Sequence, residues 1–273
     1  MELGLSGKTV IVTGGAAGIG AAIVDVLVAQ GAVPLILDRS PPDPDRLADL
    51  RVQVPATDWV TVDLTEDTQC RTAVSEVFKR HGKIDALVNN TGINDAVGLD
   101  AGPAAFRRSL DRNLVHYYTM AHLCVSEIKR QRGAIVNISS KVALTGQGGT
   151  SAYAAAKGGV LGLTREWAAE LARDGVRVNA VVPGETMTPM YRSWLSGFDA
   201  PDAKLAGIVR NIPLANRMTK ASEIATTVAF LLSDWAGHMT GQFLVVDGGY
   251  SDLDRALTST QPTTGQDTPC DMN

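Results

Sequence analysis

Residues 8–20 read KTVIVTGGAAGIG, an apolar run followed by a glycine-rich turn. The β-branched residues at 8–13 predict a buried strand, and the AAIVDVLVAQG segment after Gly20 has helical spacing with a glycine stop at Gly31. This context suits a dinucleotide, because glycines let the backbone approach a pyrophosphate and a helix N-terminus supplies free N–H groups. The alternative interpretation is an ordinary tight turn between a strand and a helix.

The next apolar run, residues 33–37, ends at Asp38. An acidic residue about 20 positions beyond a glycine turn suits the two hydroxyls of an adenosine ribose, and it would repel the extra phosphate of NADP. Arg39 follows at once and would partly offset that repulsion. We therefore expect NAD as the favoured cofactor and NADP as the alternative; without a ligand, Asp38 is simply a solvated acid at a strand end.

Strand-like runs and helical patterns alternate along the rest of the chain. Further strands are predicted at residues 59–63, 84–88, 134–138, 176–182 and 243–246, and further helices at 67–80, 104–130, 153–172 and 221–232. In the 104–130 pattern, Asn113 lies near a break in the apolar spacing. Such alternation gives right-handed crossovers and a parallel sheet. No repeat or composition break marks a second domain. We predict one α/β, Rossmann-like doubly wound domain over residues 1–257, with a mostly seven-stranded parallel sheet.

Residues 137–159, NISSKVALTGQGGTSAYAAAKGG, carry the residues with the clearest chemistry. Tyr153 and Lys157 are four positions apart, so they stand on one face of the predicted helix. An ammonium beside a phenol favours the phenolate, so we expect Lys157 to lower the pKa of Tyr153 from about 10. Such a tyrosine acts as general base on an alcohol or general acid on a carbonyl, and Ser140 is placed to hydrogen-bond the same oxygen. Tyrosine and lysine at this spacing also occur on many surface helices.

The candidate residues share one place in the predicted sheet, directly after strand ends. They are residues 14–20, Asp38, Asp63, Asn90, Ser140 and Pro183. In doubly wound sheets the carboxyl edge is where ligands bind. This shared location is the strongest argument from spacing alone.

Composition narrows the classes of partner. The 273 residues are 45% hydrophobic and 20% charged, as in ordinary globular proteins, and the net charge is −4 without a basic run. We therefore expect no nucleic-acid partner and no membrane partner. Three scattered cysteines and four ungrouped histidines predict no metal site. No signal peptide or membrane-spanning run is apparent, so we expect a cytoplasmic protein.

TGGAAGIG, NNTG, NISS, YAAAK and VVPG occur in this order, and the ordered set is specific although each motif is common. By these motifs the chain resembles the short-chain dehydrogenase/reductase family over residues 5–250. The resemblance implies a catalytic tetrad in which Tyr153 accepts the proton and Ser140 orients the reacting oxygen. Lys157 would bond the nicotinamide ribose, and Asn113 would hold a water that links Lys157 to solvent.

The same resemblance implies the cofactor contacts, with the pyrophosphate at the glycine turn and the carboxamide near Thr188. The expected set is Gly14, Ala17, Gly18, Ile19, Asp38, Arg39, Asp63, Leu64, Asn90, Gly92, Tyr153, Lys157, Pro183, Gly184 and Thr188. The hydride chemistry belongs to the cofactor itself. Thr91 departs from the family pattern, where alanine is usual, and its hydroxyl is placed near the ligand.

Substrate contacts should come from the loops after Gly92, at 141–151 and at 183–213. The expected set is polar with aromatics: Asn94, Ser140, Lys141, Gln147, Tyr153, Glu185, Tyr191 and Trp194. A sterol or acyl pocket should be mostly apolar, whereas a polar set suits a ligand rich in hydroxyls. The alternative is that several of these loop residues face solvent.

The chain is also similar to the bacterial sugar dehydrogenases of this family, L-fucose dehydrogenases in particular. The stretches that carry this resemblance include GINDAVGLD, VPGETMTPMYRSW and VDGGYSDLDRAL. That resemblance implies NAD(P)-dependent oxidation of the anomeric hydroxyl of an aldopyranose to a lactone, with L-fucose favoured over L-galactose and D-arabinose. It also implies a homotetramer.

Two other classes of function stay open. One is a dehydrogenase or reductase of another secondary alcohol or ketone, of steroid or 3-oxoacyl type. The other is a nucleotide sensor, a class that tends to lose the tyrosine or the lysine. Residues 258–273 are polar, and we expect them to have no fixed fold.

Overall fold

The computed structural model describes residues 2–253, so the polar tail expected at 258–273 lies outside the described residues. Seven strands form one sheet in the order β3-β2-β1-β4-β5-β6-β7, and every neighbouring pair is parallel. The strands are β1 (Thr9–Thr13), β2 (Val33–Asp38), β3 (Asp58–Thr61), β4 (Ala86–Asn89), β5 (Ala134–Ile138), β6 (Arg177–Pro183) and β7 (Phe243–Val246). The predicted doubly wound α/β fold is confirmed.

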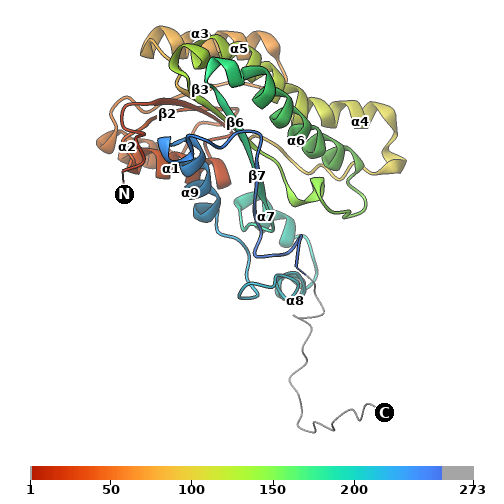
Figure 1. Ribbon diagram of the computed structural model, residues 1–273. Coiled ribbons are helices and arrows are strands. Elements are labelled where there is room, and N and C mark those ends of the chain that lie inside the picture. Colours follow the sequence, from red (N-terminus) through yellow and green to blue (C-terminus); the bar gives the residue numbers. More distant parts are fainter. Residues whose placement is uncertain (1, 254–273) are drawn as a thin grey trace, which may run out of the picture.

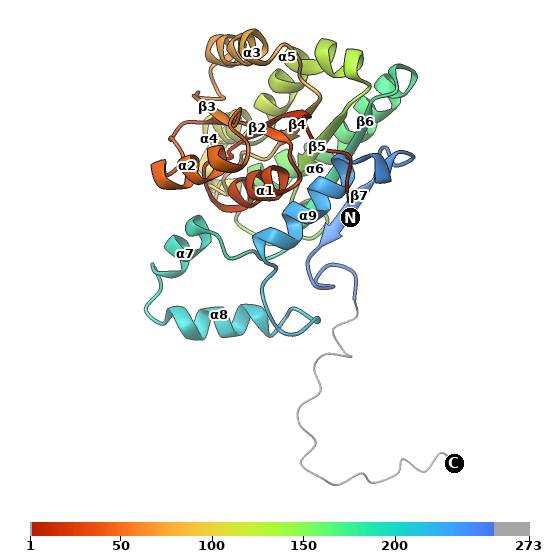
Figure 2. The ribbon, with the colours of Figure 1, turned by 90° about the vertical axis from the view of Figure 1, so that its left-hand side faces the viewer.

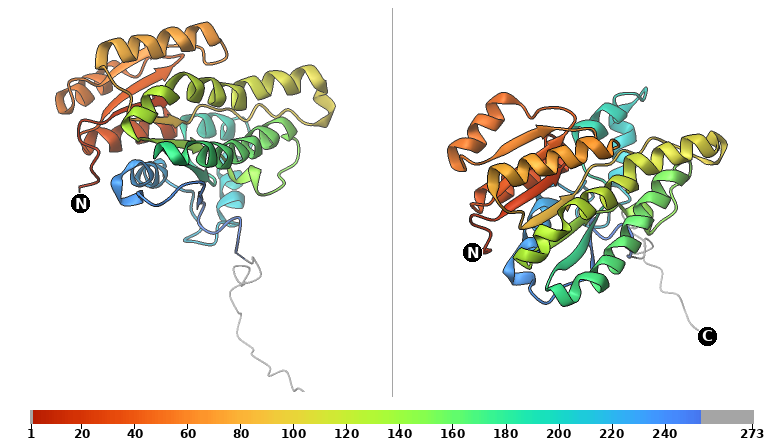
Figure 3. Two further views of the ribbon diagram at one scale, coloured as in Figure 1. Left: turned by 45° about the horizontal axis from the view of Figure 1, so that its top comes forward. Right: turned by 90° about the horizontal axis from the view of Figure 1, so that it is seen from above.

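Helices cover both faces of the sheet (Figure 1). On one face lie α1 (Gly18–Ala29), α2 (Pro44–Gln53) and α9 (Ala221–Leu232). On the other lie α3 (Asp67–His81), α4 (Gly102–Leu110), α5 (His116–Gln131) and α6 (Ser151–Leu171), and Figure 3 shows α3, α5 and α6 side by side. Single turns of 3-10 helix occur at Leu99–Ala101, Lys141–Ala143, Ala172–Asp174 and Asp234–Ala236. Two further helices, α7 (Pro189–Leu195) and α8 (Pro201–Val209), stand apart from both layers (Figure 2).

Each face of the sheet has its own apolar core. Side chains alternate along a strand, so Val10 and Val12 pack with α1 and α9, while Ile11 between them packs with α3 and α5. The central strands β1, β4 and β5 are buried throughout and read as mostly apolar runs, which is why the sequence located them, whereas the edge strands β3 and β7 are only partly buried.

Buried polar side chains fix the middle of the carboxyl edge. Asn89 Nδ2 donates to Asn137 Oδ1 (3.0 Å), and Asn137 Nδ2 donates to Thr164 Oγ1 (3.0 Å). Ser139 Oγ donates to the backbone oxygen of Lys157 (2.8 Å). Buried amides and hydroxyls are costly unless they are hydrogen-bonded, so these bonds tie β4, β5 and α6 to one register.

Two segments differ from the sequence prediction. The helical pattern expected at 104–130, with a break near Asn113, is α4 and α5 joined by a π-helical turn, Asp111–Val115, which contains Asn113. The segment expected as a polar loop after Pro183 contains α7 and α8. Helix α7 begins where Thr188 Oγ1 accepts from the Tyr191 N–H (3.1 Å) and Pro189 occupies the first turn.

No helix between residues 2 and 253 combines the length and the apolar character that a membrane crossing requires.

Candidate active site

The four residues of the expected tetrad meet at the carboxyl edge of β4 and β5. Ser140 follows β5, and its hydroxyl is hydrogen-bonded to Tyr153 on α6. Lys157, one helical turn later, places its Nζ 5.7 Å from the centre of the Tyr153 ring. Asn113 approaches from the π-helical turn, and a Cβ at Gly92 would lie 3.0 Å from Lys157 Nζ and 3.1 Å from Asn113 Oδ1. Glycine at this position therefore keeps the lysine and the asparagine close together.

The Asn113 side chain is held by the backbone on both sides. Its Oδ1 accepts from the Ile93 N–H (2.7 Å), and its Nδ2 donates to the Ser109 carbonyl (3.0 Å). It is fully buried. π-Helical turns inside α-helices are frequent at functional sites, and here the turn rotates this one amide into the tetrad.

Lys157 is almost fully buried, and its ammonium bonds to two oxygens. Nζ donates to the Tyr117 hydroxyl (2.8 Å) and to the Ile138 carbonyl (2.9 Å). The sequence analysis did not identify Tyr117. Its position four residues after Asn113, on the same helical face, is the feature that could have indicated it.

Burial controls the pKa values of the tetrad. It raises the pKa of Tyr153 to about 12, against the opposing effect of the Ser140 hydrogen bond, and it lowers the pKa of Lys157 to about 7. The lowering of the Tyr153 pKa expected from sequence is therefore wrong for this structure. Desolvation disfavours both charged forms, and Nζ bonds to Tyr117 and Ile138 rather than to Tyr153.

The glycine turn fits a dinucleotide phosphate. Gly14 and Gly18 have positive φ angles of 66° and 57°, which favour glycine. A Cβ at Gly20 would lie only 2.0 Å from the Gly14 carbonyl oxygen, so the turn packs closer than any side chain allows. No side chain caps the N-terminus of α1 at Ala17, and the helix has no acidic residue in its first turn. Its N–H groups and positive potential therefore face the turn.

The β2 and β4 ends complete this cradle. Asp38 Oδ2 accepts from the Ala16 N–H (3.1 Å), so the carboxylate lies against the glycine turn. Asn90 Nδ2 donates to the carbonyls of Thr13 (3.0 Å) and Gly14 (3.2 Å). Thr91 Oγ1 is shielded from solvent, has no hydrogen-bond partner, and lies 2.8 Å from where a Cβ of Gly14 would be. An orphaned hydroxyl beside a phosphate-type turn fits a ligand with polar atoms there.

The other expected cofactor residues lie on α1, after the ends of β2, β3 and β6, and at the start of α7. Thr188 lies over the glycine turn from the start of α7, 3.5 Å from where a Cβ of Gly18 would be. Gly184 follows Pro183 at the end of β6, where a Cβ would meet Asp247 at 2.6 Å. Thr65 bonds to Asp63 after β3 and lowers the pKa of that carboxyl. Leu64 is buried, Ile19 packs against the core below α1, and Arg39 is exposed.

A second polar cluster lies beside the tetrad, and we call it the Lys141 cluster: Lys141, Glu185, Tyr191 and Tyr250. Lys141, adjacent to Ser140, is 7% exposed; its Nζ forms an ion pair with Glu185 Oε1 and lies 3.8 Å from the centre of the Tyr250 ring. Burial raises the pKa of Tyr191, and the Glu185 carboxylate to which its hydroxyl donates raises it further. Glu185 and Tyr250 also line a pocket of about 360 Å³ together with α8.

The structure thus brings together Lys141, Glu185 and Tyr191 from the expected substrate set and adds Tyr250, which the sequence analysis missed. Asn94 and Gln147 are exposed in their loops. Trp194 is 48% exposed and makes edge contacts with Tyr191 and Phe198. It therefore covers the outer side of the Lys141 cluster.

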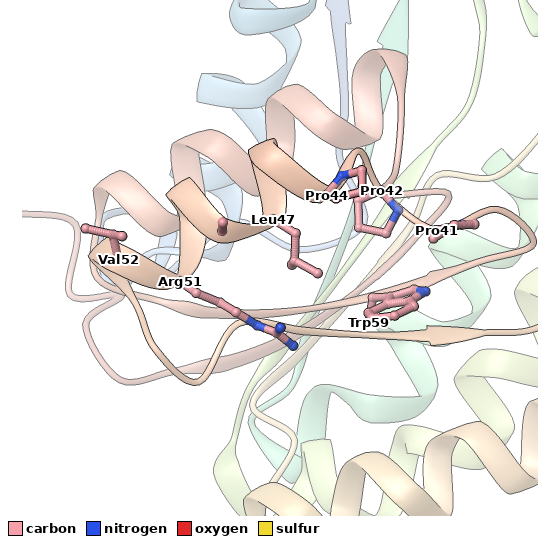
Figure 4. A pocket seen from close by; sticks show the side chains of 8 residues that line it. Pro41, Pro42, Pro44, Leu47, Arg51, Val52 and Trp59 are labelled. Atoms are coloured by element: carbon pink, nitrogen blue, oxygen red, sulfur yellow. The ribbon is translucent and has the colours of Figure 1, made fainter.

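A separate, mostly apolar groove of about 590 Å³ lies between α2 and the edge strand β3. Figure 4 shows Leu47 from the helix and Trp59 from the strand lining it, with Pro41, Pro42 and Pro44 at one end. It contains no residue of the tetrad or of the Lys141 cluster. Between residues 2 and 253, no group of three or more metal-ligating side chains is close enough to hold an ion.

Comparison with known proteins gives consistent matches over nearly the whole chain. Residues 14–251 match the family model described as enoyl-(acyl carrier protein) reductase. The L-fucose dehydrogenase of Bos taurus is 36% identical over 246 residues, which is 89% of this chain and 89% of that protein. The 3-oxoacyl-(acyl-carrier-protein) reductase FabG of Thermotoga maritima is also 36% identical, over 248 residues, 90% of this chain and 98% of that protein.

Among solved structures, that of the Cj0485 dehydrogenase matches with a TM-score of 0.91 and 44% identity, covering 94% of this chain and 98% of that one. The match therefore extends over nearly the whole of both chains.

Proposed function

The chain belongs to the short-chain dehydrogenase/reductase family of NAD(P)-dependent oxidoreductases, and we propose that it oxidises the anomeric hydroxyl of an aldopyranose to the lactone. L-Fucose is the first candidate substrate, and NAD is the favoured cofactor because Asp38 lies at the glycine turn. The similarity to an L-fucose dehydrogenase supports this choice of sugar.

The observation that carries the proposal is the buried Lys141–Glu185 pair next to Ser140. A sugar ring offers hydroxyls that donate to the carboxylate and accept from the ammonium. A steroid or acyl chain would instead press hydrocarbon against two charges and leave them without polar contacts, which is unfavourable. The pocket of about 360 Å³ beside Glu185 is at the small end of ligand sites, as a monosaccharide requires.

The chemistry follows from the tetrad. The Tyr153 phenolate takes the proton of the C1 hydroxyl while Ser140 hydrogen-bonds the same oxygen. A bound nicotinamide cofactor would supply the acceptor for the hydride from C1. The C1–O bond becomes the lactone carbonyl. Lys157 supplies a hydrogen-bond donor and, when protonated, a positive charge that favours the phenolate.

A second candidate function is the reduction of a 3-oxoacyl thioester, in which the carbonyl is reduced and no alcohol is oxidised. It rests on the FabG relative and on the raised pKa of Tyr153, which keeps that phenol protonated near neutral pH, as a general acid must be. The polar Lys141 cluster argues against it.

The decisive experiment is an initial-rate panel with NAD and NADP in parallel. L-Fucose, L-galactose and D-arabinose are assayed against D-fucose and D-glucose as controls, and acetoacetyl thioester is assayed with the reduced cofactors. Rapid turnover of L-fucose that disappears in Tyr153→Phe, with cofactor binding retained, supports sugar oxidation. Turnover of the thioester alone would select the second candidate.

A further inference from the structure

Tyr117 is a fully buried phenol on α5 that touches Lys157 directly. Its Oη lies 2.8 Å from Lys157 Nζ and 2.8 Å from the Ile138 carbonyl, and Nζ lies 2.9 Å from the same carbonyl. These three groups close a small hydrogen-bonded triangle behind the tetrad. Nζ also lies between two phenol rings, 4.8 Å from the centre of Tyr117 and 5.7 Å from that of Tyr153.

The direction of each hydrogen bond in the triangle is fixed. A carbonyl oxygen only accepts, so the Tyr117 hydroxyl donates its one proton to the Ile138 carbonyl. Burial keeps the Tyr117 phenol neutral, because it raises the pKa well above the ordinary value. Tyr117 Oη can therefore face Lys157 only as an acceptor. An ammonium has three donors, and Tyr117 and Ile138 engage two of them. One N–H is left for the active site.

We propose that Tyr117 is a positioning residue for Lys157: it fixes the ammonium at the inner wall of the site and directs the remaining N–H and the charge toward the reacting groups. The proposal rests on the proposed function only in taking Tyr153 as the proton acceptor. Nothing in it depends on which alcohol is oxidised.

The electrostatic surroundings explain why an accepting phenol matters here. Between residues 2 and 253, no carboxylate forms an ion pair with Lys157, whose pKa burial lowers to about 7. His116, the neighbour of Tyr117 on α5, is buried with a pKa lowered to about 3, so it contributes no charge near neutral pH. The groups facing Nζ are therefore uncharged: Tyr117 and Ile138 at hydrogen-bond distance, and Tyr153 across the site.

Removing the Tyr117 hydroxyl should change the protonation equilibria of both Lys157 and Tyr153. The Lys157 ammonium loses one of its two acceptors, so its protonated form becomes less favourable. A smaller positive charge near Tyr153 makes the phenolate less favourable in turn, so the Tyr153 pKa rises. Phenolate at a given pH falls about tenfold for each unit of that rise.

The test is Tyr117→Phe, which keeps the buried ring and removes only Oη. We expect the alkaline rise in alcohol oxidation to move up by about one pH unit, and kcat at fixed pH to fall about tenfold with little change in the substrate KM. The matched control is Tyr118→Phe on the same helix, because that ring is 57% exposed and stacks on His122. It should behave as the parent protein.

A readout without substrate separates this proposal from the sugar assignment. The ultraviolet difference titration of tyrosinate, taken between each protein and its Tyr153→Phe counterpart, reports the ionisation of Tyr153 alone. A shift to higher pH in Tyr117→Phe supports the proposal even if no aldose is oxidised, in which case only the sugar assignment fails. An unchanged titration midpoint and pH profile in a folded Tyr117→Phe protein would reduce Tyr117 to a packing residue. Tyr117→Met, a flexible side chain of similar reach, repeats the test if the phenylalanine variant does not fold.

Discussion

The Lys141–Glu185 pair makes one substitution, Glu185→Gln, informative for both stability and function. The two side chains are only 9% and 18% exposed, and the lysine ammonium also lies against the Tyr250 ring. Glutamine keeps the shape and one accepting oxygen but removes the negative charge. The Lys141 ammonium then stays buried without its counter-ion.

The expected loss follows from that burial. Removing one partner of a buried ion pair costs roughly 3–5 kcal/mol, and the retained acceptor places this case near 3 kcal/mol. For a domain of this size, that corresponds to a fall in melting temperature of about 6 to 12 °C. Replacing both partners, as in Lys141→Met with Glu185→Gln, leaves no uncompensated charge and should recover most of the loss.

The assay is thermal and urea unfolding of both variants, together with KM for the best aldose. Asp174→Asn is the control, because its partner Lys129 and the aspartate itself are 40% and 39% exposed, and such pairs contribute about 0–1 kcal/mol. We expect Glu185→Gln to raise the KM for the sugar at least about tenfold, because one hydrogen bond to a charged group is lost. Parent-like stability together with a parent-like KM would refute both the buried pair and its contact with substrate.

Three further outcomes are expected. The rate of alcohol oxidation should rise about tenfold per pH unit from pH 7 to 10, because burial raises the pKa of Tyr153 to about 12 and the phenolate is the base; a flat profile of kcat/KM would contradict this. Asp38→Ala should increase the ratio of NADP to NAD affinity about tenfold or more, measured by fluorescence titration. Thr91→Ala removes an orphaned hydroxyl, so the free protein should gain about 1 kcal/mol in urea unfolding while cofactor affinity falls about fivefold; equal cofactor affinity would show that the hydroxyl makes no contact.

The pattern of apolar residues was sufficient to predict the strands of the sheet, because each strand's pattern lies within its own few residues. Runs such as 10–12 are apolar on both faces, which is typical of a buried parallel strand. The same local character located the break near Asn113, since a π-helical turn shifts the apolar spacing by one residue. Helices α7 and α8 were missed because they are short, and because Trp194 of α7 packs against Phe198 in the turn between them and not in the apolar cores of the sheet.

Contacts between distant segments were beyond sequence reasoning. Lys141 and Glu185 were each expected near substrate, but their pairing depends on how far β5 and β6 extend and on the bend after Pro183. Tyr250 reaches Lys141 from beyond β7, more than a hundred residues away in the chain. No periodicity links such positions; only the strand order of the sheet does.

The electrostatics of the tetrad also could not be predicted from the sequence. Spacing alone places Lys157 one turn from Tyr153, and at that level the lysine should make the phenol more acidic. The structure reverses the sign, because desolvation penalises the charged form of each group and shifts the phenol and the amine toward their neutral forms. The Ser140 hydrogen bond opposes the shift of the phenol, and we propose that Tyr117, which accepts from Nζ, does the same for the ammonium. If Tyr153 is the proton acceptor, its pH dependence should respond to substitutions at its hydrogen-bond partner Ser140 and, through Lys157, at Tyr117, and not only at the lysine one turn along α6.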